Sequence, residues 1–264
     1  MFKGIIKLTW SGFFLFILLF YSVNGFSYEI EPLDKKLLSK EKSALNLVFC
    51  PLNYPDKEAF QKDTQGLIAR LKRTKPFDEL SVSFSIWQVN FTGAEAVQVF
   101  KPTQGFPPLK VRNDLLAYIS SKLKSREYKF VIIDAKGSTS CAELSSIEKT
   151  SLIILGKARY KGKNRFAKGF LHELGHSLGL YDECVDCAQL SSGGYPNCAA
   201  TKEEAQEWWG DLVSKDSRVN FISGCCGNKY YLRPTIASLM NDPDKAKDFG
   251  PVNERYLKKV LNPH

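Results

Sequence analysis

The sequence predicts an α+β protein in which a mixed β-sheet packs against helices. Two observations support this prediction. Short apolar runs bounded by turn residues are typical of buried strands, and longer segments carry apolar residues at helical spacing. These segments follow one another as strand, helix, strand, helix, strand, strand and helix, an order that places helices on a sheet. The length of 264 residues allows one large domain or two lobes around a cleft.

The first predicted elements lie between residues 45 and 86. Residues 45–50 form a short apolar run that ends at Pro51, which predicts a buried strand. Asp56 can cap a helix whose apolar stripe continues to Leu71. Phe84 and Ile86 alternate with serines, which is the period of a strand with one buried face. The later elements are a helix from Asn113 or Asp114 through Lys124, and strands over 130–133 and 152–155.

The N-terminus has the pattern of a secretory signal peptide. Lys3 and Lys7 precede an almost wholly apolar run that ends at Val23, and small residues follow it near a plausible cleavage point. We therefore expect residues 1–25 to be removed, with an uncleaved membrane anchor as the alternative. Residues 26–44 are polar and lysine-rich, which predicts a leader segment or short pro-region. The mature protein would be secreted or periplasmic and would meet a membrane only transiently.

The charge of the chain narrows the class of partner. The formal net charge is +9, which favours acidic partners. Basic runs interleaved with aromatic residues are absent from the sequence, as are zinc-finger and helix-turn-helix patterns, so nucleic acid is not an expected partner. The segment 157–165 carries Lys157, Arg159, Lys161, Lys163 and Arg165, and we expect this basic loop either to border a cleft or to be solvated.

Residues 171–183 contain a candidate zinc site. Apolar residues at helical spacing predict a helix here, and helix positions four apart face the same way. His172 and His176 could therefore share one metal ion, with Glu173 beside them. In zinc peptidases such imidazoles bind the metal, and the carboxylate takes a proton from the attacking water. The sequence thus predicts a Zn²⁺ site in which Glu173 is the general base.

A catalytic zinc site takes three protein ligands and leaves one position open. The chain has three histidines, and the third, His264, is its last residue. Gly179 is expected to end the helix through a positive φ angle and to turn the chain back toward the metal. Asp182 would then arrive as the third ligand, while Glu183 beside it remains an alternative.

The spacing of His172, Glu173, His176, Gly179 and Asp182 resembles the signature of the metzincin zinc peptidases. The only methionine besides the initiator, Met240, stands in a Ser-Leu-Met-Asn run that is similar to the Met-turn beneath the metzincin zinc ligands. A narrower similarity is to the bacterial peptidase family named for an immunoglobulin A-cleaving metallopeptidase, and it extends from about residue 45 to 253. Its landmarks are Leu45 to Phe49, Tyr54, Phe60, Asp63, Pro76-Phe77, Phe84, Trp87, Asp182-Glu183, Pro196-Asn197, Trp208-Trp209, Tyr231 to Thr235, and Ser238.

The chain departs from these patterns at two places. The narrower family has one more residue between the glycine and the Asp-Glu pair, and an aromatic residue where this chain has Cys184, which keeps Glu183 open as a ligand. Some metzincins place a zinc-reaching tyrosine two residues after the methionine, where this chain has Asp242. Tyr230 or Tyr231 is therefore the expected hydrogen-bond donor to the transition state.

The resemblance implies a metzincin-like fold with the zinc helix across the cleft. Residues 45–179 would form the catalytic N-terminal lobe, and residues 180–264 an irregular, disulfide-rich C-terminal lobe that contains the Met-turn. The implied function is peptide-bond hydrolysis by a secreted zinc metalloendopeptidase. We expect a monomer whose partner is a protein or peptide substrate, with acidic substrates favoured by the charge.

Two alternatives to this function remain. A thermolysin-like site would take its third ligand from a glutamate on a later helix, and Glu203, Glu204 and Glu207 are available. That scheme explains neither Gly179 nor Met240. The second alternative is a non-catalytic secreted binding protein or adhesin on a metzincin-like scaffold, in which Glu173 would be dispensable.

The cysteines predict covalent cross-links in the C-terminal lobe. Export would place the seven cysteines in an oxidising compartment, where up to three disulfides could form with one thiol left over. Five of them crowd the segment after the zinc helix, and a second, structural zinc site formed by these five is the alternative. The seven are Cys50, Cys141, Cys184, Cys187, Cys198, Cys225 and Cys226.

Overall fold

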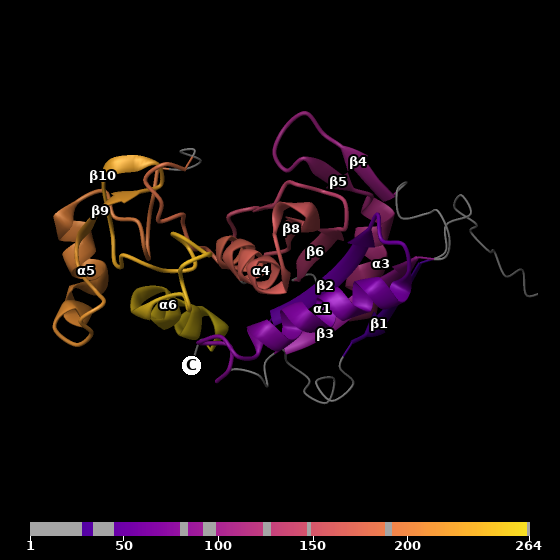
Figure 1. Cartoon of the computed structure of the whole chain (residues 1–264), viewed down its shortest axis with the longest axis horizontal. Coiled ribbons are helices and arrows are strands. Elements are labelled where there is room, and N and C mark those ends of the chain that lie inside the picture. Colours follow the sequence, from indigo (N-terminus) through magenta and orange to yellow (C-terminus); the bar gives the residue numbers. More distant parts are fainter. Residues whose placement is uncertain are drawn as a thin grey trace, which may run out of the picture.

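The computed structural model describes residues 28–33, 45–79, 84–91, 99–123, 128–146, 149–187 and 192–262. Within these residues the chain is an α+β protein in which helices pack on a mixed sheet, as predicted, and they cover both of its faces (Figure 1). The predicted signal peptide, residues 26–27 and 34–44 of the predicted leader, and His264 lie outside the described residues.

A six-stranded sheet forms the centre of the N-terminal half, with strand order β1-β3-β2-β6-β8-β7. The four inner strands, β3, β2, β6 and β8, are mutually parallel, and the two edge strands, β1 and β7, are antiparallel to their neighbours. The sheet is therefore mixed. Its strands are β1 (Tyr28–Pro32), β2 (Leu45–Leu52), β3 (Phe84–Phe91), β6 (Lys129–Asp134), β7 (Cys141–Ala142) and β8 (Ser151–Gly156).

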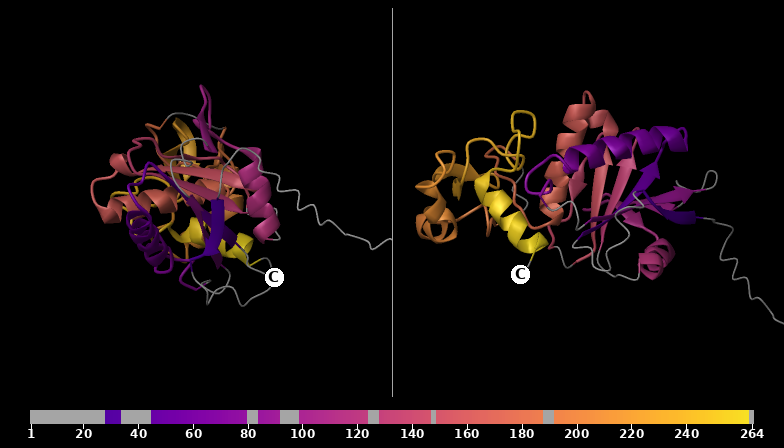
Figure 2. Two further views of the ribbon diagram at one scale, coloured as in Figure 1. Left: turned by 90° about the vertical axis from the view of Figure 1, so that its right-hand side faces the viewer. Right: turned by 90° about the horizontal axis from the view of Figure 1, so that it is seen from below.

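Helices cover the two faces of this sheet. On one face lie α1 (Lys57–Leu71) and α4 (Lys163–Ser177), and on the other lies α3 (Asn113–Leu123) (Figure 2). Parallel strands that are covered on both faces read as continuous apolar runs, and β8 is buried along its whole length for this reason. The sheet thus carries an apolar core on each side.

The predicted helix after the first inner strand forms as α1. The Asp56 side chain accepts a hydrogen bond from the Ala59 N–H at 2.7 Å, so it is the N-cap that the sequence indicated. The predicted strands over 45–50, 130–133 and 152–155 form within β2, β6 and β8. Since each of these elements depends on local apolar periodicity, the sequence alone was enough to find them.

The C-terminal part of the chain lies beyond α4, away from the sheet (Figure 1). Trp209, Val219 and Val252 form a small apolar cluster there. The ring of Phe249 meets Phe77 at 5.9 Å between centroids, so this part shares the main core with the N-terminal half. Its elements are α5 (Lys202–Val213), β9 (Ile222–Cys225), β10 (Asn228–Arg233) and α6 (Pro251–Leu261).

The C-terminal lobe was predicted to be irregular, and this was wrong in part, because α5, β9, β10 and α6 form there. Further elements outside this lobe were also not predicted. Strand β1 extends the edge of the sheet from within the predicted leader, pairing Ile30 with Val89. A short hairpin of β4 (Phe100–Pro102) and β5 (Leu109–Val111) flanks the break predicted from Pro102 to Pro108. The 3₁₀ turn η3 (Lys157–Arg159) joins β8 to the loop before α4. Strand β1, the two hairpin strands and η3 have three to five residues each, too few for a periodic pattern to appear in the sequence. None of the described helices combines the length and apolarity needed to cross a membrane.

Candidate metal centre

The candidate metal centre is built on the C-terminal end of α4. The helix ends at Ser177, and Gly179 takes a φ of +99°. The N–H of Leu180 donates to the Gly175 carbonyl at 3.0 Å, and that of Gly179 to the His176 carbonyl at 3.0 Å. This pair of bonds is a Schellman motif, which requires a left-handed residue at the glycine position. The predicted turn at Gly179 is confirmed.

The turn brings Asp182 back against the two histidines. Asp182 Oδ1 lies 3.3 Å from His172 Nε2 and 3.4 Å from His176 Nε2. The two Nε2 atoms are 3.2 Å apart. The three atoms therefore form a nearly equilateral triangle, with the side chains of all three residues partly exposed.

The outer nitrogens of both imidazoles face backbone carbonyls. His172 Nδ1 lies 2.8 Å from the Leu239 oxygen, and His176 Nδ1 lies 2.8 Å from the Leu180 oxygen. A carbonyl only accepts hydrogen bonds, so both Nδ1 atoms carry the proton. In the neutral histidines each Nε2 then carries no proton and can only accept a hydrogen bond. Each of them faces the Nε2 of the other histidine and the carboxylate of Asp182. Such a triangle repels itself unless a proton or a cation lies at its centre.

The size of the triangle can be compared with that of a zinc site. Ligand atoms about 2.0–2.2 Å from a tetrahedral zinc lie about 3.3–3.6 Å from one another. The observed separations of 3.2, 3.3 and 3.4 Å agree with this edge length. The donor set of two imidazoles and one carboxylate also suits zinc. The residues therefore fit a zinc ion that keeps one coordination position open.

The close approach of the two imidazoles and the carboxylate shifts the pKa values of His172 and Asp182 in the metal-free protein. Burial alone would lower the pKa of His172, but the hydrogen bond to Asp182 and the charge of Glu173 raise it to about 9. Burial would raise the pKa of Asp182, but the hydrogen bonds with His172 and His176 hold it far below its usual value. Without a metal, a proton on the histidine pair takes the place of the cation.

Glu173 faces the same space from α4. Its side chain is buried, and one of its carboxylate oxygens lies within 4.8 Å of the ligand atoms of His172 and His176. Burial raises its pKa, against the opposing charges of the two histidines. Within the described residues Glu173 makes no hydrogen bond or salt bridge, so its carboxylate is available to a molecule in the cavity.

The Met240 segment packs against α4 at Gly175, between the two histidines. Met240 is fully buried, and its Sδ would lie 2.5 Å from a Cβ placed on Gly175. A glycine at this position of α4 lets the thioether approach the helix between the two histidines. The carbonyl of the neighbouring Leu239 is the acceptor that orients His172.

Glu183, the alternative ligand, is engaged elsewhere. Its fully buried carboxylate accepts hydrogen bonds from Ser238 Oγ at 2.6 Å, Asn253 Nδ2 at 2.7 Å and Asn197 Nδ2 at 3.0 Å. Its backbone N–H donates to the Met240 carbonyl at 2.8 Å. Glu183 therefore ties the Asp182 segment to the Met240 segment and to α6. Its role was missed because all of its partners are distant in sequence.

A cavity of about 690 Å³ opens in front of these residues. The cavity is lined by His172, Glu173, His176 and Asp182. Arg159 of the basic loop lines it too, so this loop borders the cavity, which was one of the two alternatives predicted for it. Other residues that line it are Phe106, Cys141, Ala142, Leu144, Tyr160, Arg165, Tyr181, Asp242 and Asp244.

The two tyrosines predicted as transition-state donors are placed elsewhere. Tyr230 is 73 % exposed on β10, and Tyr231 packs against Cys198 and its neighbours. Neither lines the cavity, so their predicted role needs correction. The tyrosines that do line it are Tyr160 and Tyr181. Tyr160 lies in the loop before α4, whereas the resemblance to metzincins indicates a tyrosine after the methionine.

The glutamates of the thermolysin-like alternative lie on α5, away from the cavity. Glu204 caps its own helix by accepting from the Ala200 N–H at 2.8 Å and completes a capping box with Thr201. Glu203 and Glu207 are exposed on the same helix. None of the three lines the cavity. The geometry therefore favours Asp182 over this alternative.

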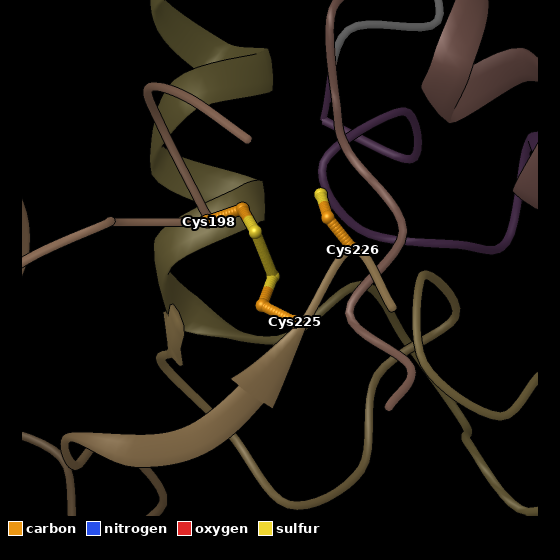
Figure 3. A group of neighbouring side chains, drawn as sticks. All are labelled: Cys198, Cys225 and Cys226. Carbon is orange, nitrogen blue, oxygen red and sulfur yellow. A yellow bond between two sulfur atoms is a disulfide. The ribbon is translucent and has the colours of Figure 1, made fainter. Parts of the chain in front are cut away.

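Two disulfides cross-link the segment after α4. Cys184 pairs with Cys187. Cys198 pairs with Cys225, next to Cys226 (Figure 3). The prediction of disulfides among the five clustered cysteines is thus confirmed for two pairs. Because four of the five are taken up in these pairs, the structure does not favour the thiolate zinc site. The other three cysteines, Cys50, Cys141 and Cys226, are not part of a disulfide.

The chain matches no known family model, and no curated protein matches it.

Proposed function

We propose that the protein is a zinc-dependent endopeptidase of the metzincin type, secreted or periplasmic as its N-terminal sequence indicates. The observation that carries the proposal is the triangle of His172 Nε2, His176 Nε2 and Asp182 Oδ1, with edges of 3.2, 3.3 and 3.4 Å. Its three acceptors favour a cation at their centre, and the cavity gives a substrate access to it. The Met240 segment beneath them is consistent with the resemblance to metzincins.

The proposed reaction uses few residues of the chain. Zinc held by the triangle would lower the pKa of a water molecule and polarise a carbonyl group. Glu173 would take the proton from the water as it attacks the scissile carbonyl carbon, and would then give that proton to the leaving amine. Its raised pKa suits both steps, since a carboxyl group that is both donor and acceptor works best near the pH of the reaction.

The edge of the sheet supports a peptide as substrate. Strand β7 is an edge strand of the sheet, and Cys141 and Ala142, which form it, both line the cavity. An extended peptide can bind to such an edge through its main-chain groups. A substrate held in this way would pass directly in front of Glu173 and the triangle, which favours cleavage within a chain.

Glu173 also bears on the choice between an enzyme and a non-catalytic binding protein. A buried carboxylate without a hydrogen-bond partner costs stability. Within the described residues Glu173 has no such partner, so the fold gains nothing from it. A costly group without a structural role is expected where a reaction needs it.

The test is to replace Glu173 by Gln, which preserves shape and removes the base. We expect the variant to fold and to bind one zinc per chain, while peptide hydrolysis falls by about 10²–10⁴-fold. Metal content, the unfolding curve and the rate of cleavage of a peptide mixture are measured together. Glu203→Gln on α5 is the matched control and should keep full activity. Undiminished hydrolysis by Glu173→Gln would contradict the proposed mechanism, and loss of zinc would show that Glu173 is a ligand.

A further inference from the structure

The loop from β8 into α4 is held against the body of the protein at three points. Lys157 Nζ lies 2.5 Å from Asp63 Oδ2 on α1. The N–H of Ala158 donates to the Gly137 carbonyl at 2.9 Å. The ring of Tyr160 packs so closely on α4 that Gly169 there has no room for a Cβ. The residue between these contacts, Arg159, therefore has a fixed backbone, and its side chain lines the cavity.

Two arginines line the cavity, Arg159 and Arg165, and the exposed Arg159 is the one without a partner among the described residues. Arg165 pairs with Asp244 at 2.7 Å, and Asp242 pairs with Lys245 at 3.1 Å. Within the described part of the chain, Arg159 makes neither a hydrogen bond nor a salt bridge. An arginine carries five N–H donors in a planar fork and keeps its charge at any physiological pH. The cavity wall thus presents an exposed guanidinium that is available to bind a planar anion.

The position of this guanidinium relates it to the proposed reaction. Its charge acts on Glu173 on α4, on Tyr160, and on Cys141 in the edge strand β7. Arg159 therefore lies near both the proposed base and the strand on which a peptide would be held. A substrate group that reaches Arg159 would belong to a residue close to the cleaved bond.

We propose that Arg159 is a specificity-determining residue that binds a carboxylate of the substrate, an inference that rests on the peptidase function proposed above. A carboxylate matches the guanidinium fork with two parallel hydrogen bonds, which a lysine or an amide on the substrate cannot reproduce. The carboxylate comes either from a Glu or Asp side chain near the cleaved bond or from the C-terminus of a short peptide. In both cases the carboxylate binds the guanidinium of Arg159, which has no partner among the described residues.

The experiment compares peptides that differ in a single group. The zinc-loaded protein is given peptides with Glu, Gln or Lys at each position around the cleaved bond, and each peptide is made with a free and with an amidated C-terminus. The unaltered protein should cleave the carboxylate-bearing peptide with a kcat/KM about tenfold above that of its neutral partner, the lower end expected for a hydrogen bond to a charged group.

Charge reversal at Arg159 separates recognition from a structural role. Arg159→Gln should reduce the preference to near unity, and Arg159→Glu should invert it so that Lys peptides are cleaved better than Glu peptides. Lys161→Glu is the matched control, because Lys161 carries the same charge in the same loop but does not line the cavity. It should keep the preference of the unaltered protein.

The outcomes distinguish the two proposals. A preference that follows the side chain or one that follows the free C-terminus supports the inference and identifies the source of the carboxylate. Equal cleavage of charged and neutral peptides, or a preference that survives both Arg159 variants, overturns the inference and leaves the peptidase intact. If no peptide is cleaved by the zinc-loaded protein, both proposals fall.

Discussion

Replacing Glu183 tests whether the Asp182 segment is held by the contacts seen in the structure. Glu183→Ala removes a fully buried carboxylate that accepts hydrogen bonds from Ser238, Asn197 and Asn253. Ser238 Oγ then has no acceptor. Asn197 and Asn253 keep one each, since they also donate to the carbonyls of Tyr181 and Phe249.

The expected magnitude follows from these contacts. Hydrogen bonds to a charged group contribute about 1.5–3 kcal/mol each and offset much of the cost of burying the carboxylate. Burial still outweighs them enough to raise the pKa of Glu183, so the loss expected on replacement comes mainly from the unpaired Ser238 hydroxyl and the space left behind. We expect the free energy of unfolding of the metal-free protein to fall by about 2–4 kcal/mol at pH 7. Because Asp182 precedes Glu183, zinc affinity should also fall by about 10–100-fold, as for other residues that orient a ligand.

The assay is urea unfolding of the metal-free protein, followed by a competitive zinc titration. Glu203→Ala, an exposed glutamate on α5, is the control and should change stability by less than about 0.5 kcal/mol. A Glu183→Ala variant with unchanged stability and unchanged zinc affinity would refute the reasoning. Zinc affinity as low as that of Asp182→Ala would instead identify Glu183 as a ligand.

Two further predictions concern the histidines and the helix that carries them. The pKa of His172 in the metal-free protein is raised from 6.5 to about 9, so the stability from this group is complete below pH 6.5 and is lost as the pH rises through 9. Zinc binds the neutral imidazole, so the zinc affinity should rise close to tenfold per pH unit between about pH 7 and 9. A zinc affinity that does not change with pH would contradict this prediction. Gly175→Ala should lower stability by about 1–2 kcal/mol and weaken zinc binding, because its Cβ would meet Met240 Sδ at 2.5 Å and the buried Phe249 at 3.1 Å. The control Gly66→Ala, which has open space on α1, should raise stability by about 0.5–1 kcal/mol, and equal effects of the two changes in thermal unfolding would refute the steric argument.

The parts of the fold that were predicted correctly depend on neighbours in the sequence. The helix α1 follows from Asp56 and the apolar stripe behind it, and the Schellman turn follows from Gly179. The inner strands are apolar along their length because both faces of the sheet are covered. Strand β1 was missed since its pairing with β3 depends on residues about sixty positions away, as in the register of Ile30 with Val89.

The candidate site divides in the same way. The sequence by itself determined that His172, Glu173 and His176 share one end of a helix and that Gly179 returns Asp182 to them, because helical spacing and a glycine turn are local properties. Only the tertiary structure decided that Glu183 serves as an anchor, that Tyr160 lines the cavity in place of Tyr230 and Tyr231, and that Arg159 lines it without a partner in the described part of the chain. Each of these depends on contacts between segments far apart in the chain, as with Ser238 and Glu183, 55 residues apart, which no local pattern encodes.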